Sequence, residues 1–147
     1  MRAEETMIRT YLDSGTLIYA GRGEDTSAEV VLNILDDANR EFVSSPFVKL
    51  EVLPKAVYFG KLEEADFYRE YFASILEMPD DYDVIIAAAQ SYAERYGLAG
   101  MDALHIAAAV LAGAEEFITT EAVTKPMFRV TELKVTRLQS LMKIEET

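Results

Sequence analysis

The chain has 147 residues and a mass of 16.5 kDa, which is the size of a single domain. Its 26 acidic and 14 basic residues give a net charge of −12, which argues against a protein that coats nucleic acid with a basic surface but leaves room for a nucleic-acid enzyme with metal ions in an acidic cleft. The chain has no cysteine and a single histidine, so thiolate zinc sites, cysteine nucleophiles and multi-histidine metal sites are excluded.

The pattern of apolar residues, helix caps and Gly/Pro positions predicts strands that alternate with helices. In chain order we expect a strand over 7–12, helices over 14–20 and 27–39, a strand over 41–45, a helical arm over about 46–77 whose second helix covers 63–77, helices over 83–96 and 101–112, and strands over 117–120 and 133–136. Residues from 137 onward are left unassigned. Because strands separated by helices form parallel sheets, we expect one α/β domain over 1–147 with a central, mainly parallel sheet and helices on both faces.

No run of residues approaches the roughly 18 apolar residues that a membrane span requires. The first ten residues contain Glu4 and Glu5 and have no long apolar run, so they do not resemble a signal peptide. We therefore expect a cytoplasmic protein without a membrane partner.

Four carboxylates stand apart from the other acidic residues because of their surroundings. Asp13 ends the apolar strand of YLDSGTLIYA, and Glu121 ends the strand of FITTE. Glu51 lies in the apolar and basic helix SPFVKLEVLPK, and Asp102 opens the small-residue helix MDALHIAAAV. Acids among apolar residues are costly unless they are paired, protonated or bound to cations. Oxygen ligands without histidine or cysteine suit Mg²⁺ or Mn²⁺, which can promote phosphoryl transfer.

Each of these acids also has a purely structural interpretation. Asp13 can be the N-cap of the following helix, and Asp102 can simply favour a helix start. Glu51 can pair with Lys55 one turn later, and Glu121 can be a surface acid. The metal interpretation gains weight jointly, because three of the four acids fall at strand ends or helix starts, where an α/β cleft forms.

The segments YLDSGTLIYA, SPFVKLEVLPK, GLAGMDALHIAAA and FITTE resemble the PIN domain family, especially the VapC-like ribonuclease toxins. The resemblance runs from about Tyr11 to Arg129. It implies a PIN-like three-layer α/β/α sandwich and a Mg²⁺- or Mn²⁺-dependent endoribonuclease, the toxin of a type II toxin–antitoxin pair, in which Asp13, Glu51, Asp102 and Glu121 are the catalytic metal ligands.

Two positions depart from the family pattern. Ser14-Gly15 stands where the family has a hydroxyl residue followed by asparagine, and Glu121 stands where aspartate is more usual. Both departures bear on a second metal ion more than on the first. They keep open the alternative of a catalytically degenerate PIN-fold binding module.

Several further side chains are candidates for contacts with substrate or with the acidic residues. They are Ser14, Thr119, Thr120, His105, Lys49, Lys55, Lys125 and Arg129. The structural alternative for the threonines is local capping, for the lone histidine a packed side chain, and for the cations ordinary solvation.

The segment 58–72 holds six of the fifteen aromatic residues, and 61–83 is strongly acidic. Since aromatic residues are enriched at interface centres, we expect this arm to meet a protein chain, either a second copy in a homodimer or an antitoxin. The alternative is that these aromatic side chains fill the core.

A different enzyme class, a haloacid-dehalogenase-like phosphatase, is suggested by LDSGTL. That chemistry needs a second acid two residues after the nucleophile, and the residue there is Gly15, so this alternative ranks below the others.

Overall fold

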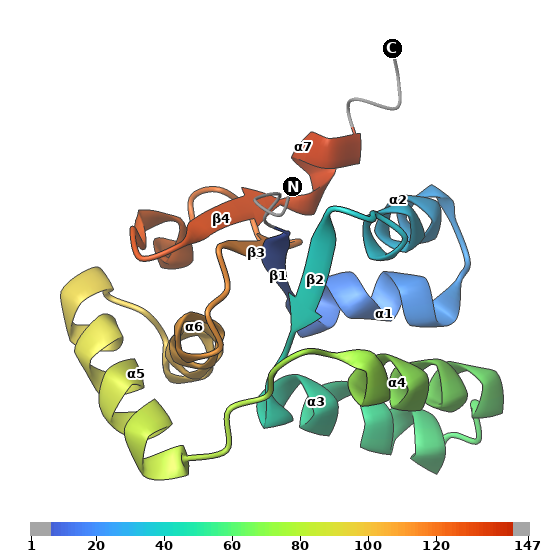
Figure 1. Cartoon of the computed structure of the whole chain (residues 1–147), viewed down its shortest axis with the longest axis horizontal. Coiled ribbons are helices and arrows are strands. Elements are labelled where there is room, and N and C mark those ends of the chain that lie inside the picture. The colour runs from blue at the N-terminus through green and yellow to red at the C-terminus, as the bar shows by residue number, and fades with distance from the viewer. Residues whose placement is uncertain (1–6, 143–147) are drawn as a thin grey trace, which may run out of the picture.

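The computed structural model describes residues 7–142 as four strands flanked by helices (Figure 1). The elements in chain order are β1 (Ile8–Leu12), α1 (Ser14–Arg22), α2 (Thr26–Leu35), β2 (Arg40–Val43), α3 (Pro46–Tyr58), α4 (Leu62–Ser74), α5 (Tyr82–Tyr96), α6 (Gly100–Leu111), β3 (Glu116–Thr119), the short 3₁₀ helix η1 (Pro126–Arg129), β4 (Lys134–Arg137) and α7 (Leu138–Met142). Every predicted strand and helix between 7 and 136 is present, and the unassigned region after 136 adds α7. The predicted domain over 1–147 extends at both ends beyond the described residues.

The sheet has the order β2-β1-β3-β4, and each neighbouring pair is parallel. Helices α1 and α2 lie on one side of the sheet and α5 and α6 on the other, with the α3–α4 hairpin beyond the lower end of β2 (Figure 1). This arrangement confirms the predicted three-layer α/β/α fold. The carboxyl ends of β1 and β3 therefore open toward the starts of α1 and α3.

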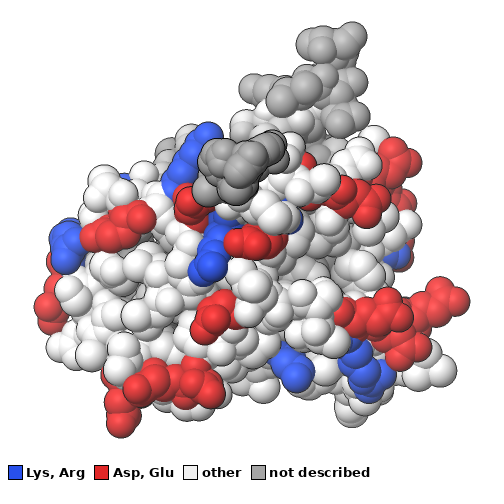
Figure 2. Space-filling view, viewed as in Figure 1, with Lys and Arg blue, Asp and Glu red and all other residues white. Residues whose placement is uncertain are grey.

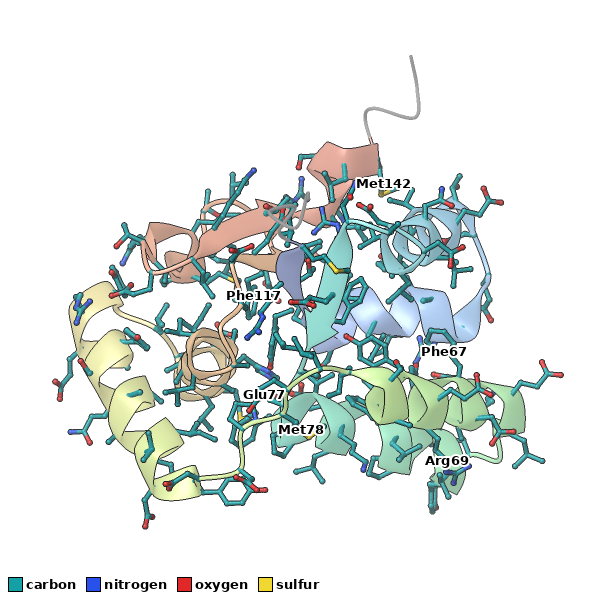
Figure 3. The ribbon with its side chains drawn as sticks, in the orientation of Figure 1. Phe67, Arg69, Glu77, Met78, Phe117 and Met142 are labelled. Carbon is teal, nitrogen blue, oxygen red and sulfur yellow. The ribbon has the colours of Figure 1, made fainter. Side chains whose placement is uncertain are left out.

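The core lies between the sheet and both helical layers. The central strands contribute Tyr11, Leu12, Phe117 and Ile118, all almost completely buried; Figure 3 shows Phe117 at the middle of the molecule. At Gly21 the backbone of α1 approaches α4 so closely that a Cβ atom there would lie 2.5 Å from the Tyr68 ring. A larger residue at this position would force the two helices apart.

Two predicted helix ends are wrong, and tertiary pairing explains the larger error. The helix predicted over 63–77 ends at Ser74, because the following residues run along the edge of β2. The amide of Leu76 donates to the carbonyl of Phe42 at 2.7 Å, and the amide of Ser44 donates to the carbonyl of Glu77 at 3.1 Å. The helix predicted over 27–39 ends at Leu35, because the chain must turn before β2 begins at Arg40.

The aromatic face of the arm is largely part of the core. Tyr68, Tyr71 and Phe72 are buried within the chain, and Phe67 lies between α4 and α1 (Figure 3). The expectation that this face meets another chain is wrong for these residues, since they already cover α1 and β2. The exposed aromatic residues of the segment are Tyr58 and Phe59, at the turn between α3 and α4.

Acidic side chains gather over the start of α5 and over α4 on the face shown in Figure 2, whereas the basic side chains are scattered. The acidic segment around α4 and the 80–83 turn therefore faces solvent. Within 7–142, none of the helices combines the length and the apolar character that crossing a bilayer demands.

Candidate active site

Asp13 occupies the junction between the central strand β1 and helix α1. Its carboxylate accepts a hydrogen bond from the amide of Thr16 at 3.0 Å and so caps α1. Burial raises the pKa of Asp13, an effect that hydrogen bonds from Thr119 and Thr16 and the nearby His105 reduce without cancelling it. The N-cap interpretation is thus correct, and the same carboxylate is also a buried acid at the carboxyl end of the sheet.

Glu51 lies on α3 and is joined to the Asp13 region through two side chains. The hydroxyl of Ser14, the residue after Asp13, donates to the Glu51 carboxylate. On the other side, Nε2 of His105 lies 3.1 Å from Oε1 of Glu51. Within the described residues Glu51 has no ion pair with Lys55, so its predicted structural partner is wrong, although the residue is exposed.

Asp102 and Glu121 fall at the expected places in the fold, but their side chains are not drawn into one group with the other two acids. Asp102 lies in the first turn of α6, one turn before His105. Glu121 follows β3; its backbone amide donates to the Thr119 hydroxyl oxygen at 3.0 Å, and its carboxylate lies 3.7 Å from Nζ of Lys125. Across residues 7–142, no three acidic or histidine side chains are arranged closely enough to hold a metal ion.

Thr120 fills the space beside Gly15, where the family pattern has a side-chain amide. A Cβ atom at Gly15 would lie 2.8 Å from Oγ1 of Thr120 and 3.9 Å from Oδ1 of Asp13. A hydroxyl from the end of β3 therefore stands near the position that the missing side chain would occupy. The other hydroxyl, on Thr119, touches Asp13 and caps the turn into Glu121, so it has both of its predicted roles.

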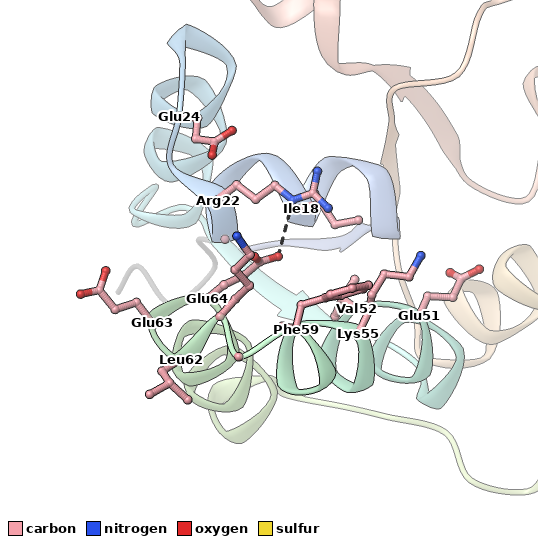
Figure 4. A pocket seen from close by; sticks show the side chains of 14 residues that line it. Ile18, Arg22, Glu24, Glu51, Val52, Lys55, Phe59, Leu62, Glu63 and Glu64 are labelled. Carbon is pink, nitrogen blue, oxygen red and sulfur yellow. Dashed lines mark ion pairs between the residues drawn. The ribbon is translucent and has the colours of Figure 1, made fainter.

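A groove of about 700 Å³ begins at Glu51 and runs between α1 and the α3–α4 hairpin (Figure 4). Its cations are Arg22, Lys55 and Lys61, of which Arg22 pairs with Glu64 at 3.7 Å. Phe59 and Val52 form an apolar floor between the charged residues (Figure 4). Of the predicted cations, Lys55 therefore lies in the same groove as Glu51.

The other predicted cations have contacts of their own. Lys49 lies over the Phe72 ring, 6.0 Å from its centroid, and Arg129 donates to the carbonyl of Tyr96 at 3.0 Å. Lys125 is the partner of Glu121 already described. Lys49 and Arg129 thus support packing and a loop, respectively.

Sequence reasoning missed two residues beneath the site. The hydroxyl of Tyr11 lies 2.8 Å from Nδ1 of His105 and 2.7 Å from Oγ of Ser45. Burial raises the pKa of Tyr11 well above its usual range, so the hydroxyl keeps its proton. The available signal was a tyrosine inside a buried strand, because its hydroxyl needs a hydrogen-bonding partner.

The donor set fits a hard divalent cation in its chemistry. Carboxylate and hydroxyl oxygens dominate the site, and the buried Asp13 carboxylate has no ion pair with a lysine or arginine among the described residues. Ser14, the residue after Asp13, contacts Glu51, whereas Asp102 on α6 and Glu121 after β3 are not grouped with them in the described residues. Asp13 and Glu121 thus follow neighbouring parallel strands at one edge of the sheet, and the groove begins at Glu51.

An acidic edge at the carboxyl ends of parallel strands defines an α/β domain with a candidate hydrolytic site. The model of the PIN domain family matches residues 10–124, and this chain belongs to that family. PIN domains are generally nucleases, so the family is one of hydrolases that act on nucleic acids.

Solved structures share the fold at low sequence identity. VapBC2 from Rickettsia felis, bound to a promoter DNA fragment, is 16% identical over 88% of this chain and 98% of its own, with a TM-score of 0.65. A toxin–antitoxin complex from Klebsiella pneumoniae is 19% identical over 85% of this chain and 98% of its own, with a TM-score of 0.63. VapBC-1 from nontypeable Haemophilus influenzae is 16% identical over 90% of this chain and 99% of its own, with a TM-score of 0.64. A search of curated protein sequences finds no match.

Proposed function

We propose that this PIN domain is a metal-dependent endoribonuclease and the toxin of a type II toxin–antitoxin pair. The observation that carries the proposal is the buried Asp13 carboxylate at the carboxyl end of β1, linked through Ser14 to Glu51. Family membership supports nuclease chemistry, and the solved relatives include toxin–antitoxin complexes. Degradation of cellular RNA would take place in the cytoplasm, which is the location we propose.

We assign Asp13, Glu51, Asp102 and Glu121 as the ligands of Mg²⁺ or Mn²⁺. Such a cation lowers the pKa of bound water and neutralises charge on the phosphate during hydrolysis of a phosphodiester. The chain's own residues prepare for it: the Thr16 amide fixes Asp13, and Ser14 and His105 fix Glu51.

Substrate contacts are proposed for the residues around the acids. Lys55 lines the groove that begins at Glu51 and can meet the RNA backbone there. Thr120 lies beside Asp13 and Gly15 and can donate a hydrogen bond to a phosphate oxygen. Lys125 would have to leave Glu121 to do the same. The exposed acidic side chains of the 80–83 turn would repel RNA, and Glu63 and Glu64 of α4 would do so at the far end of the groove, so the substrate would enter at the end that holds Lys55 and Glu51 (Figure 4).

We also propose two protein partners, an antitoxin and a second copy of the chain. Exposed apolar side chains suited to such contacts lie on α3 and at its end: Leu50, Val57, Tyr58, Phe59 and Leu62. In light scattering, a homodimer would have twice the mass of 16.5 kDa. A Tyr58→Ser, Phe59→Ser variant that keeps both dimerisation and antitoxin binding would show that this surface is not used.

Cleavage of structured RNA by the purified chain, with Mg²⁺, Mn²⁺ or EDTA, tests the nuclease proposal. Two N-cap aspartates provide a matched pair of variants, because Asp81 caps α5 through the Val84 amide as Asp13 caps α1. We expect Asp13→Asn to abolish cleavage and Asp81→Asn to leave it unchanged. Loss of activity in both variants would assign the effect to folding instead.

Two other outcomes separate the alternatives. No turnover with any metal, together with retained RNA binding, would support a degenerate PIN-fold binding module, for which the missing amide at Gly15 is the argument. Hydrolysis of small phosphate esters without RNA cleavage would support a phosphatase, although PIN family membership gives that alternative no support.

A further inference from the structure

A buried row of hydrogen-bonding side chains runs from the start of α3 through the centre of the molecule to Glu51. Ser45, the N-cap of α3, contacts the Tyr11 hydroxyl at 2.7 Å, and that hydroxyl contacts Nδ1 of His105 at 2.8 Å. Nε2 of His105 then meets Oε1 of Glu51 at 3.1 Å. Four separate elements, the β2–α3 junction, β1, α6 and α3, are joined in this row.

The chemistry of the last member fixes the direction of the final hydrogen bond. A carboxylate oxygen only accepts, so Nε2 of His105 must carry a proton and donate it to Glu51. If the ring is neutral, Nδ1 accepts from the Tyr11 hydroxyl, and if it is charged, Nδ1 donates to it. In both cases His105 donates to Glu51 from one side while Tyr11 holds the ring from the other.

Packing keeps the imidazole in this orientation. His105 is buried, and the ring of Phe47 meets it edge-on with centroids 6.2 Å apart and planes at 80°. Tyr11 is itself fixed by stacking on Phe117, with ring centroids 5.0 Å apart and planes at 12°. Neither ring can turn away without opening the core around β1 and β3.

Glu51, by contrast, is a partly exposed side chain at the mouth of the groove, with 41% of its side chain accessible. A free glutamate at such a position samples many rotamers, and each must be given up when the carboxylate binds a ligand. The donors from Ser14 and His105 remove that freedom before any ligand arrives.

We propose that His105 is a positioning residue that holds the Glu51 carboxylate against Ser14 at the mouth of the groove, ready to bind a divalent cation. The inference rests on the proposed function, since it assigns Glu51 a role in cation binding. It makes Tyr11 and Ser45 the support of the histidine. His105 touches neither substrate nor metal in this assignment.

Two substitutions at His105 separate positioning of Glu51 from packing. His105→Gln places an amide nitrogen near the position of Nε2 and retains the bond to Glu51, whereas His105→Asn places one near Nδ1 and retains only the contact with Tyr11. Each variant loses one of two hydrogen bonds at the same buried site, so a merely structural role would lower the thermal stability and the Mn²⁺ affinity of both alike.

Isothermal titration of Mn²⁺ into the full-length chain provides the first readout. We expect the affinity of His105→Asn to fall about tenfold, the scale of lost support behind a metal ligand, while His105→Gln stays within about threefold of the unmodified chain. Equal affinities in both variants would overturn the positioning role while leaving metal binding intact. No Mn²⁺ uptake by the unmodified chain would overturn the proposed function and the cation role of Glu51 together.

The single histidine allows a second, direct readout. Because the sequence has no other imidazole, its ¹⁵N resonances need no assignment. We expect the metal-free spectrum to show a protonated Nε2 whose shift changes in Glu51→Gln, and we expect the signals to move with Mg²⁺ and to broaden with Mn²⁺. Imidazole signals indifferent to both Glu51→Gln and Mg²⁺ would overturn the proposal.

Discussion

Two buried carboxylates lie at opposite ends of the same sheet and have opposite electrostatic surroundings. Glu116 begins β3, where Arg40 donates to it at 2.8 Å and Thr136 at 2.5 Å. Asp13 follows β1 and receives hydrogen bonds from Thr16 and Thr119, without a basic side chain paired to it in the described residues. Both acids belong to the same sheet, but only Glu116, at the amino end, has a basic side chain as its partner within the described residues.

The pKa values of the two acids express this difference. Burial raises the pKa of Glu116, but hydrogen bonds from Thr136 and Arg40 and the charge of Arg40 outweigh it and leave the pKa below its usual value. At Asp13 burial prevails and the pKa is raised. The neighbours of Glu116 at the amino end of the sheet therefore stabilise its charged form, whereas burial at the carboxyl end disfavours the charged form of Asp13.

Removing Arg40, the basic partner of Glu116, gives the largest expected effect on stability. Arg40→Met leaves Glu116 buried without its ion pair, with the Thr136 hydroxyl as a hydrogen-bond donor and the charge of Lys134 nearby, and we expect the free energy of unfolding to fall by about 3 kcal/mol in urea denaturation. The double variant with Glu116→Leu should recover most of that loss, because no unpaired charge remains. A double variant as unstable as Arg40→Met would show that Arg40 acts by packing and not by pairing.

Removing a single hydroxyl from the same end should cost less. Thr136→Val keeps the shape of the side chain but takes the donor from Oε2 of Glu116, and we expect a loss of about 2 kcal/mol. Thr131→Val, at an exposed threonine, is the matched control and should stay within about 0.5 kcal/mol of the unmodified chain. Equal effects in the two variants would contradict the special role of the Glu116 contact.

Neutralising Asp13 at the carboxyl end of the sheet should raise the stability of the chain instead of lowering it. Asp13→Asn keeps an oxygen for the Thr16 amide but removes the buried charge, so we expect the chain to gain about 1 kcal/mol at pH 7 while it loses the proposed activity. Since the pKa of Asp13 is raised on folding, its charge costs stability as the pH rises through the folded pKa, and this cost is absent below about 3.9, the pKa in the unfolded chain. Denaturation at pH 7 and pH 3.5 should therefore show the gain and then its disappearance. A gain that persists at pH 3.5 would assign it to something other than charge.

The fold was accessible from the sequence because each element carries local signals. Ser45 and Pro46 predict the start of α3, and the structure has Ser45 as its N-cap with Pro46 as the first helical residue. The end of α4 was not accessible, because residues 75–77 leave the helix to pair with Phe42 on β2 and with Ser44 directly after it. Pairing across more than thirty positions has no signature in a local window.

The candidate site divides in the same way. The positions of Asp13 and Glu121 at strand ends follow from the pattern of apolar residues, and the acidic edge follows from parallel topology. The hydrogen bond between Glu51 and His105 joins residues 54 positions apart and depends on how α3 crosses α6. The sequence therefore could not decide between a functional and a purely structural role for either residue. Tyr11 carries a hydroxyl in a buried strand, but the sequence does not show that Ser45 and His105 are its partners.

The smallest expected effect comes from an exposed arginine–carboxylate pair within one helix, which contrasts with the buried Arg40–Glu116 pair between strands. Arg69 contacts Asp66 at 3.1 Å on α4, with more than half of each side chain accessible to solvent. Water and salt screen such a pair, so Arg69→Ala should change the free energy of unfolding by about 0.3 kcal/mol, and that change should vanish in 1 M NaCl. Arg40→Met measured in the same salt should keep most of its effect, because burial shields its pair from screening. If salt erased both effects equally, burial would not be what distinguishes the amino end of the sheet, and the contrast with Asp13 would lose its physical basis.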